Sequence, residues 1–187
     1  WSGMALDEAR GIVYVQTASP KPNFMGNLNY GRNLFSNCII AIDVRSGQRL
    51  WHFQELRHDI WDKDVSAPPI LTTITRHGKR VDVVAQLTKS GNTLLLDRVS
   101  GKPIFPFRLR RAPTSTIPGM KTWPYQPDLE LPESFGAQEF TLDDVTDISA
   151  ESRQFILDKF ARDGAMMGWM LPNALNRPNV IPNIDGG

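Results

Sequence analysis

The sequence predicts an all-β fold, and three observations support this prediction. Short runs rich in Val, Ile, Leu and aromatic residues recur through the first 107 residues. Turn signals that contain glycine separate these runs, and one turn segment occurs twice. Short β-rich runs with turns at regular spacing are typical of all-β architectures, so we expect strands rather than helices to form the body of the protein.

The expected strands follow one another closely. Residues 11–17 (GIVYVQT) form the first, and a loop rich in proline and glycine, from Ser19 to Asn33, follows it and is a candidate wall of a site. Three hairpins come next, with their strands at 38–44 and 48–54, at 67–75 and 79–88, and at 92–99 and 102–107.

Two of the turns resemble each other in detail. AIDVRSGQRLW (41–51) aligns with LLDRVSGKPIF (95–105) at an offset of 54, which matches Asp43 with Asp97, Ser46 with Ser100, Gly47 with Gly101 and Trp51 with Phe105. In this pattern Asp caps the turn, Gly permits it and the aromatic residue packs between repeats. A repeat of this length fits a propeller blade, although D-x-x-S/T-G turns also occur in other β proteins.

The composition changes after Phe107. Residues 108–140 carry five prolines and indicate an excursion over the surface. A short helix is expected to begin after Ser149 as N-cap, to end at Gly164 and to decorate the β body, with Phe155, Ile156 and Phe160 on one face. We therefore divide the chain into a blade core (1–107) and a region of excursion, short helix and irregular tail (108–187).

Charge and cysteine content exclude some classes of function. The chain has 21 Lys and Arg against 20 Asp and Glu, so its net charge of +1 gives no electrostatic footprint for nucleic acid. No run reaches the ~18 apolar residues that a membrane span needs. The single cysteine, Cys38, lies in an apolar segment and is expected to be a buried small hydrophobe.

The segment RHDIWDKD (57–64) is the first candidate site, because it lies on a loop directly after an expected strand. Two interpretations stay open from spacing alone. Asp59, Asp62 and Asp64 form a solvated charged turn, or one of them is a catalytic carboxylate whose pKa the neighbouring Trp61 raises by creating a partly apolar pocket. His58 has no second histidine at metal-ligand spacing and is expected to be structural.

Lys89, in LTKSGNT, is the second candidate, since it lies near a strand end. A surface lysine is the competing interpretation. The chain has no phosphate-binding P-loop, no Gly-x-Gly-x-x-Gly fingerprint and no Gly-x-Ser-x-Gly elbow. These absences disfavour a nucleotide-binding enzyme and a serine hydrolase.

Several segments, in this order, resemble the dehydrogenases that depend on pyrroloquinoline quinone (PQQ), in particular the membrane-type glucose dehydrogenase branch. They are WSGMALDEARGIVYVQTASPKPNF, AIDVRSGQRLW, HDIWDKD and LTKSGNTLLLDRVSGKP. The resemblance covers most of the chain and is strongest through about residue 107. It implies an eight-bladed propeller, of which this chain would supply about three to four blades as an internal fragment.

The resemblance also implies roles for individual residues. Asp62 matches the catalytic base, which takes the proton of the substrate hydroxyl while hydride leaves to the quinone. Lys89 matches a lysine that contacts the quinone oxygens, and Trp1 matches the tryptophan on which the cofactor stacks. With Trp61, these are the predicted cofactor-binding residues, and Asp59 and Asp64 are expected to form the loop or to set the pKa of Asp62.

The metal site is the weakest part of the resemblance. The alcohol dehydrogenase pattern supplies an asparagine to calcium where this chain has Ser19, although a hydroxyl or carbonyl oxygen also suits a hard cation such as Ca²⁺ or Mg²⁺. The acidic metal ligand of the family belongs to an earlier blade, so the site would be incomplete here.

The expected function is therefore oxidation of a sugar or other alcohol by a periplasmic PQQ-dependent dehydrogenase. A quinone or a cytochrome would accept the electrons, any membrane anchor would lie outside this chain, and the fragment alone would be inactive. Two alternatives remain, a non-catalytic propeller scaffold and a propeller that binds carbohydrate without turnover.

Overall fold

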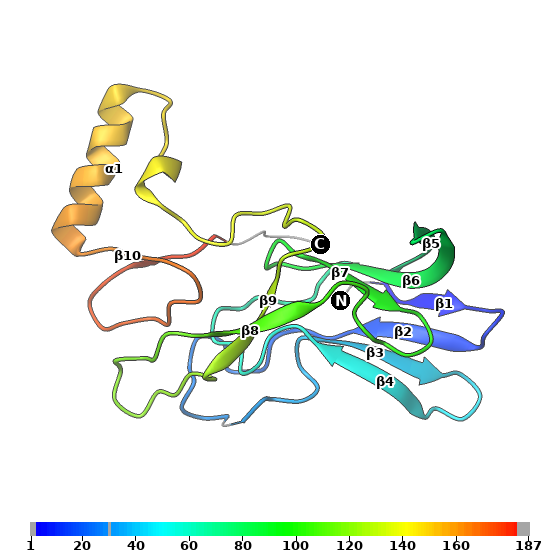
Figure 1. Cartoon of the computed structure of the whole chain (residues 1–187). Helices are drawn as coiled ribbons and strands as arrows, with labels where there is room; N and C mark the ends of the chain where they lie inside the picture. The colour runs from blue at the N-terminus through cyan, green and yellow to red at the C-terminus, as the bar shows by residue number, and fades with distance from the viewer. Residues whose placement is uncertain (1–2, 30, 183–187) are drawn as a thin grey trace.

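The computed structural model describes residues 3–29 and 31–182 (Figure 1). Two antiparallel sheets and a hairpin make up the β body, and one α-helix stands at the end of the molecule away from both sheets (Figure 1). Among the described residues, no helix is both long and apolar enough to cross a membrane.

The first sheet is a four-stranded antiparallel meander in the order β1-β2-β3-β4. Alternation places Ile12 and Tyr14 of one strand on the buried face, as a half-buried strand requires. The expected strands at 11–17, 38–44 and 48–54 are present, whereas the short first strand was not predicted. The bounds are β1 (Ala5–Asp7), β2 (Ile12–Gln16), β3 (Cys38–Asp43) and β4 (Arg49–Gln54).

The second sheet has three strands, β5 (Ile70–Arg76), β6 (Lys79–Leu87) and β7 (Thr93–Asp97). The expected strand at 102–107 is wrong: only an isolated bridge joins Pro103 to Leu96. Beside this bridge the amides of Asp97 and Ile104 still bond the carbonyls of Lys102 and Leu95. The next amide that would face β7 belongs to position 106, where proline has no N–H, and the pairing stops. The two sheets have the form of propeller blades, against an expectation of about three to four blades.

The hairpin of β8 (Phe107–Arg111) and β9 (Tyr125–Leu129) lies in the proline-rich region. The remaining elements are the 3₁₀ turn η1 (Leu142–Asp144), helix α1 (Ala150–Asp163) and a parallel pair of two-residue strands, β10 (Met166–Met167) and β11 (Asn179–Val180).

Helix α1 has the predicted ends but not the predicted packing. The hydroxyl of Ser149 accepts a hydrogen bond from the amide of Ser152, and Gly164 adopts the left-handed conformation at the C-terminal end. The apolar face does not pack on the β body: Phe155 is 66% exposed, and Phe160 contacts Phe140 of the excursion. The prediction that the helix decorates the sheets was therefore wrong.

The two repeated turns have the same hydrogen bonds. Oδ1 of Asp43 accepts from the amides of Arg45 and Ser46 and from the Ser46 hydroxyl. Oδ1 of Asp97 accepts from the equivalent amides and from the Ser100 hydroxyl. The capping role inferred from the sequence is thus confirmed at both copies.

The main hydrophobic core lies between the two blades. Its centre is the aromatic pair of Tyr14 and Trp51, whose ring centroids are 5.7 Å apart, packed with Leu94 and Leu96 of the second blade. Both aromatic polar groups donate to the same acceptor, the carbonyl of Arg98, at 2.9 Å from the Tyr14 hydroxyl and 3.3 Å from the Trp51 indole. Trp51 therefore packs between the blades, as predicted for the first copy of the repeat. Phe105, the aromatic residue of the second copy, instead lies under the guanidinium of Arg76 in its own blade.

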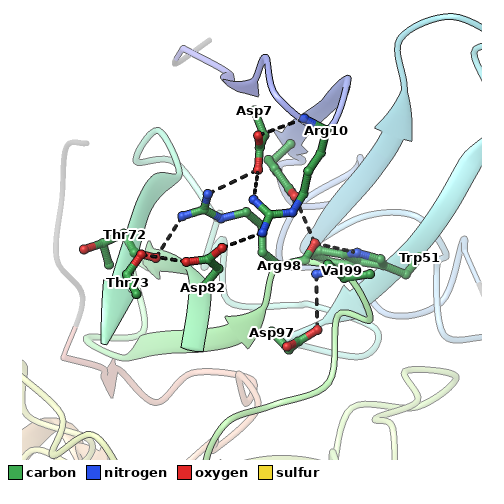
Figure 2. Close-up of polar contacts among 10 residues, drawn as sticks. Asp7, Arg10, Trp51, Thr72, Thr73, Asp82, Asp97, Arg98 and Val99 are labelled. Atoms are coloured by element: carbon green, nitrogen blue, oxygen red, sulfur yellow. Dashed lines mark hydrogen bonds and ion pairs between the residues drawn. The ribbon is translucent and has the colours of Figure 1, made fainter. Parts of the chain in front are cut away.

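A network of ion pairs also joins the two blades (Figure 2). Arg10 and Arg98 both bind the carboxylate of Asp7, and Arg10 also reaches Asp82 on β6. Burial alone would raise the pKa of Asp7, but the two guanidinium partners lower it below its ordinary value. The first and second blades are thus joined by charge as well as by apolar packing.

The two glycines of the repeated turn, Gly47 and Gly101, allow a matched test of the packing between the blades. Both have positive φ, +71° at Gly47 and +68° at Gly101, but an added Cβ would meet open space at the first and overlap the Trp51 ring at the second. We expect Gly47→Ala to cost about 1–2 kcal/mol of unfolding free energy through backbone strain. Gly101→Ala should cost about 1–3 kcal/mol more through overpacking, measured by urea unfolding of this chain. Equal costs would contradict the packing described.

Candidate functional site

The loop after β4 is organised by the carboxylate of Asp59, which is 2% exposed. This carboxylate accepts hydrogen bonds from the amides of Trp61 and Lys63, both at 2.8 Å. It also accepts from the Ser19 hydroxyl at 2.5 Å and from the Asn37 side chain at 2.9 Å. Three segments are tied together in this way, so Asp59 is a structural residue whose oxygens are already occupied.

The fixed loop turns its neighbouring side chains in opposite directions. Ile60 and Trp61 are 1% and 2% exposed and pack in a second core cluster with Leu56 and Trp169. The indole of Trp61 donates to the carbonyl of Leu171 at 2.7 Å. This burial favours a structural role for the ring, and its contact with a cofactor stays a prediction.

Asp62 points the other way, and its side chain is 27% exposed. Its backbone adopts positive φ, +60°, a conformation that aspartate tolerates better than most residues. One carboxylate oxygen accepts a hydrogen bond from the side-chain amide of Asn23, and the other lies 3.5 Å from Nζ of Lys89. Of the three acids, Asp62 is the one that combines a fixed orientation with access from solvent.

Lys89 is placed between two carboxylates. Its Nζ contacts Asp64 at 2.8 Å as well as Asp62, and its side chain is 8% exposed. Burial alone would lower the pKa of Lys89, but the hydrogen bond and charge of Asp64, with a further contribution from Asp62, raise it above its ordinary value. The lysine is therefore held as an ammonium, and the interpretation of Lys89 as a surface side chain is wrong.

Asp64 and Ser19 join the acidic loop to the loop that follows β2. The amide of Ser19 donates to Asp64 at 2.7 Å, while the Ser19 hydroxyl serves Asp59. Burial would raise the pKa of Asp64, but Lys89 and Ser19 lower it, so the carboxylate is held ionised. Ser19 is 8% exposed, and its predicted role as a metal ligand stays a prediction.

A pocket of about 330 Å³ opens over these groups, lined by Ala18, Lys21, Asp62, Asp64 and Lys89. Two ammonium groups and two carboxylates give this pocket both hydrogen-bond donors and acceptors, which suits a polar ligand. In the described part of the chain, no group of three or more His, Cys, Asp or Glu side chains could hold a metal by itself. Trp1 lies outside the described residues.

Sequence reasoning missed Asn23 and Lys21. Both lie in the loop from Ser19 to Asn33 that the proline and glycine content marked as a site wall, but nothing in its local pattern distinguishes these two side chains from their neighbours. Their roles follow only from the way this loop lies against residues some 40 positions later, as the contact between Asn23 and Asp62 shows.

His58 has the structural role expected of it. It is 3% exposed, and its Nδ1 lies 3.1 Å from the carbonyl of Gly31 and 2.9 Å from Oδ1 of Asn33. Its Nε2 lies 3.2 Å from the carbonyl of Gly26 and 3.1 Å from that of Lys121. Both ring nitrogens are used in holding loops together. Cys38 is likewise buried, and burial raises the pKa of its thiol to about 12.

Comparison with known proteins identifies the family. The whole chain, residues 1–187, matches the family model described as "PQQ: Glucose/ethanol/alcohol dehydrogenase, beta-propeller domain". The glycerol dehydrogenase large subunit of Gluconobacter oxydans is 31% identical over 100% of this chain and 26% of its own length. Quinoprotein glucose dehydrogenase A of Acinetobacter calcoaceticus is 35% identical over 65% of this chain and 16% of its own length.

Solved structures agree with this assignment. The quinohemoprotein alcohol dehydrogenase of Comamonas testosteroni superposes with a TM-score of 0.53 and 31% identity, over 65% of this chain and 19% of that structure. A europium-containing methanol dehydrogenase superposes with a TM-score of 0.54 and 27% identity, over 56% of this chain and 18% of that structure.

The sequence resemblance, the propeller fold and the cofactor that it implied are confirmed by these matches. The chain spans only about a quarter of the glycerol dehydrogenase large subunit, 26% of its length. With its blade-like sheets and a family match over its full length, the chain belongs to the β-propeller domain family of the PQQ-dependent glucose, ethanol and alcohol dehydrogenases.

Proposed function

We propose that this chain supplies part of the active site of a PQQ-dependent dehydrogenase that oxidises a sugar or other alcohol, with Asp62 as the base. The observation that carries the proposal is the meeting of Asp62 and Lys89 at one pocket, although Asp62 lies on the loop after β4 and Lys89 on the turn between β6 and β7. A scaffold or a simple sugar-binding propeller has no need for an ion pair of this kind at the mouth of a pocket.

Asp62 has the geometry that a general base needs. Its carboxylate is oriented by Asn23 on one oxygen and by Lys89 on the other, and it remains open to solvent. Asp62 would accept the hydroxyl proton of the substrate as the C–H bond breaks. When bound, PQQ supplies the acceptor for the hydride.

Lys89 would place a positive charge where the reaction develops a negative one. Asp64 keeps the lysine protonated and holds its side chain at the pocket, at 2.8 Å. A fixed ammonium in a partly buried site stabilises a developing anion more strongly than a solvated one does. The resemblance implies two further cofactor contacts, Trp1 and Trp61; the ring of Trp61 is buried in the second core cluster, so a contact from it would have to come from the edge of that cluster.

A divalent cation, Ca²⁺ or Mg²⁺, is part of the proposal for the whole protein. Ser19 is the candidate ligand that the resemblance assigns to this chain. Its amide and hydroxyl already donate to Asp64 and Asp59, so the other oxygen donors of the cation would come from parts of the whole protein outside this chain. We place the whole protein in the periplasm, with a quinone or a cytochrome as electron acceptor, on the strength of the family alone.

The substitution Asp62→Asn in the full-length protein tests the base. We expect dye-linked alcohol oxidation to fall by a factor of about 10² to 10⁴, because the amide cannot accept the proton, while PQQ stays bound. Asp147→Asn, at an exposed position that does not line the pocket, is the control and should retain full activity. Wild-type turnover in Asp62→Asn would overturn the assignment.

Lys89→Ala tests the electrostatic role. Reduction of bound PQQ, followed by absorbance in a single turnover, should slow by a factor of about 10² or more. The fold should be retained, because the amide of Ser19 still binds Asp64. Lys79→Ala, at an exposed position in β6, is the control. An unchanged rate in Lys89→Ala would show that the lysine has no part in the reaction.

Asp59→Ala separates the structural acid from the proposed base. Because it removes an acceptor shared by four buried or partly buried donors, it should lower the unfolding free energy by about 3 kcal/mol or more. Asp62→Asn should change this free energy by less than about 1 kcal/mol, since its side chain is partly exposed. Urea unfolding of both variants decides the point, and the reverse order of stabilities would refute these roles.

A further inference from the structure

Glu55, the first residue after β4, is buried and has no part in the proposed chemistry. Its side chain is 1% exposed, and Oε1 accepts hydrogen bonds from the Thr88 hydroxyl at 2.7 Å and from the Asn92 amide at 3.4 Å. Among the described residues, neither Oε2 nor the buried hydroxyl of Ser90 has a hydrogen-bond partner in good geometry, although the Ser90 side chain lies close enough to Glu55 to bond its carboxyl group. A buried carboxyl group with one unpaired oxygen calls for an explanation.

The two partners of Glu55 are the two ends of the turn that carries Lys89. Within this turn the amide of Thr88 bonds the carbonyl of Asn92 at 3.1 Å, and the amide of Gly91 bonds the carbonyl of Thr88 at 3.0 Å. The amide of Lys89 donates to the carbonyl of Asp64 at 3.2 Å. Glu55 therefore binds both ends of the turn 88–92. The shape of this turn decides where the ammonium of Lys89 lies.

The other side of the turn is covered by the excursion. The amide of Phe135 donates to the carbonyl of Gly91 at 2.8 Å, and the side chain of Gln138 donates to the carbonyl of Ser90 at 2.6 Å. The Ser134 hydroxyl donates to Oδ1 of Asn92 at 2.8 Å. None of these groups is ionisable in the ordinary pH range, so Glu55 is the titratable anchor of the turn.

We propose that Glu55 is a positioning residue for Lys89, that it holds the turn 88–92 in its protonated form, and that its ionisation loosens this turn. The part that concerns the cofactor rests on the proposed function. In the protonated acid, Oε1 remains the acceptor for Thr88 and Asn92, while the Oε2 hydroxyl can donate to Ser90, which pairs both of the unpaired atoms.

The surroundings of Glu55 oppose its ionisation. Burial raises its pKa to about 7, and the hydrogen bonds from Thr88, Asn92 and Ser90 and the charge of Lys63 only partly offset this. Thr88, Ser90 and Asn92, which face it from the turn, are uncharged. Lys63 is 4% exposed, and its Nζ bonds the carbonyl of Pro182 at 3.2 Å rather than Glu55.

The direction of the pH effect follows. Below about pH 7 the acid is neutral and the anchor is intact; above it, the folded protein carries a buried carboxylate without a contacting counter-ion. Water or Lys63 must then approach Glu55, and Lys63 is adjacent to Asp62 in the chain. Because the pKa is raised, stability falls as pH rises from the ordinary value near 4.5 to about 7 and is level beyond it.

Hydrogen exchange of the full-length protein tests the anchor without reference to activity. After correction for the intrinsic rate, protection of amides 88–92 should fall about tenfold between pH 6 and pH 8.5 in the wild type. Glu55→Gln, which keeps the shape and is always neutral, should show no such fall. Glu55→Ala should have low protection at both pH values, and the exposed control Glu151→Gln should behave as wild type.

Binding of PQQ to the apoprotein, titrated at the same two pH values, connects the anchor to Lys89. Affinity should weaken about three- to tenfold in Glu55→Ala and recover in Glu55→Gln, with wild type weakening at pH 8.5. Wild-type protection in Glu55→Ala, or pH-dependent protection in Glu55→Gln, would overturn the role of Glu55. Normal exchange results with no binding of PQQ by any variant would instead refute the proposed function and leave the anchor standing.

Discussion

The buried carboxylate of Asp59 is the constraint on which the site depends. It collects donors from the loop after β2, from the residue before β3 and from its own loop, and each donor comes from a different direction. Several short hydrogen bonds make a buried charge tolerable, and they leave its loop little freedom. The inward position of Trp61 and the outward position of Asp62 are both consequences of this arrangement. The catalytic candidate is therefore held by a neighbour that does no chemistry.

Much of the β body could be predicted because its signals are local. Alternating side chains and the Asp-Ser-Gly turns specify strands and hairpins within a few residues, and both turns have the hydrogen bonds that their sequence implies. The prediction of strands and of helix packing failed where the structure depends on contacts with residues distant in the sequence. The strand at 102–107 lacks amide donors at its prolines, β1 pairs too briefly to leave a pattern, and the apolar face of α1 meets no sheet.

The site was predictable only in part. Asp62 and Lys89 were singled out by resemblance, since spacing alone favoured a solvated turn and did not choose among the three acids, and the structure brings the pair to one pocket. Asn23 and Glu55 gave no signal, because each bonds a residue more than 30 positions away in the sequence. Lys21 gave none because only the folding of its loop brings it to the pocket. Trp61 shows the converse: its neighbours in the sequence are acids, but its ring lies among apolar side chains on the other side of the loop.

The two copies of the repeated turn differ in what packs against their glycines. The ring of Trp51, from the neighbouring blade, packs over Gly101 and fills the space beside the turn. Among the described residues, no side chain packs over Gly47, the equivalent glycine of the first copy of the repeat, and the matching space is open. Two turns with the same hydrogen bonds therefore differ in how much side chain they tolerate, because packing between blades and not the turn itself sets the limit.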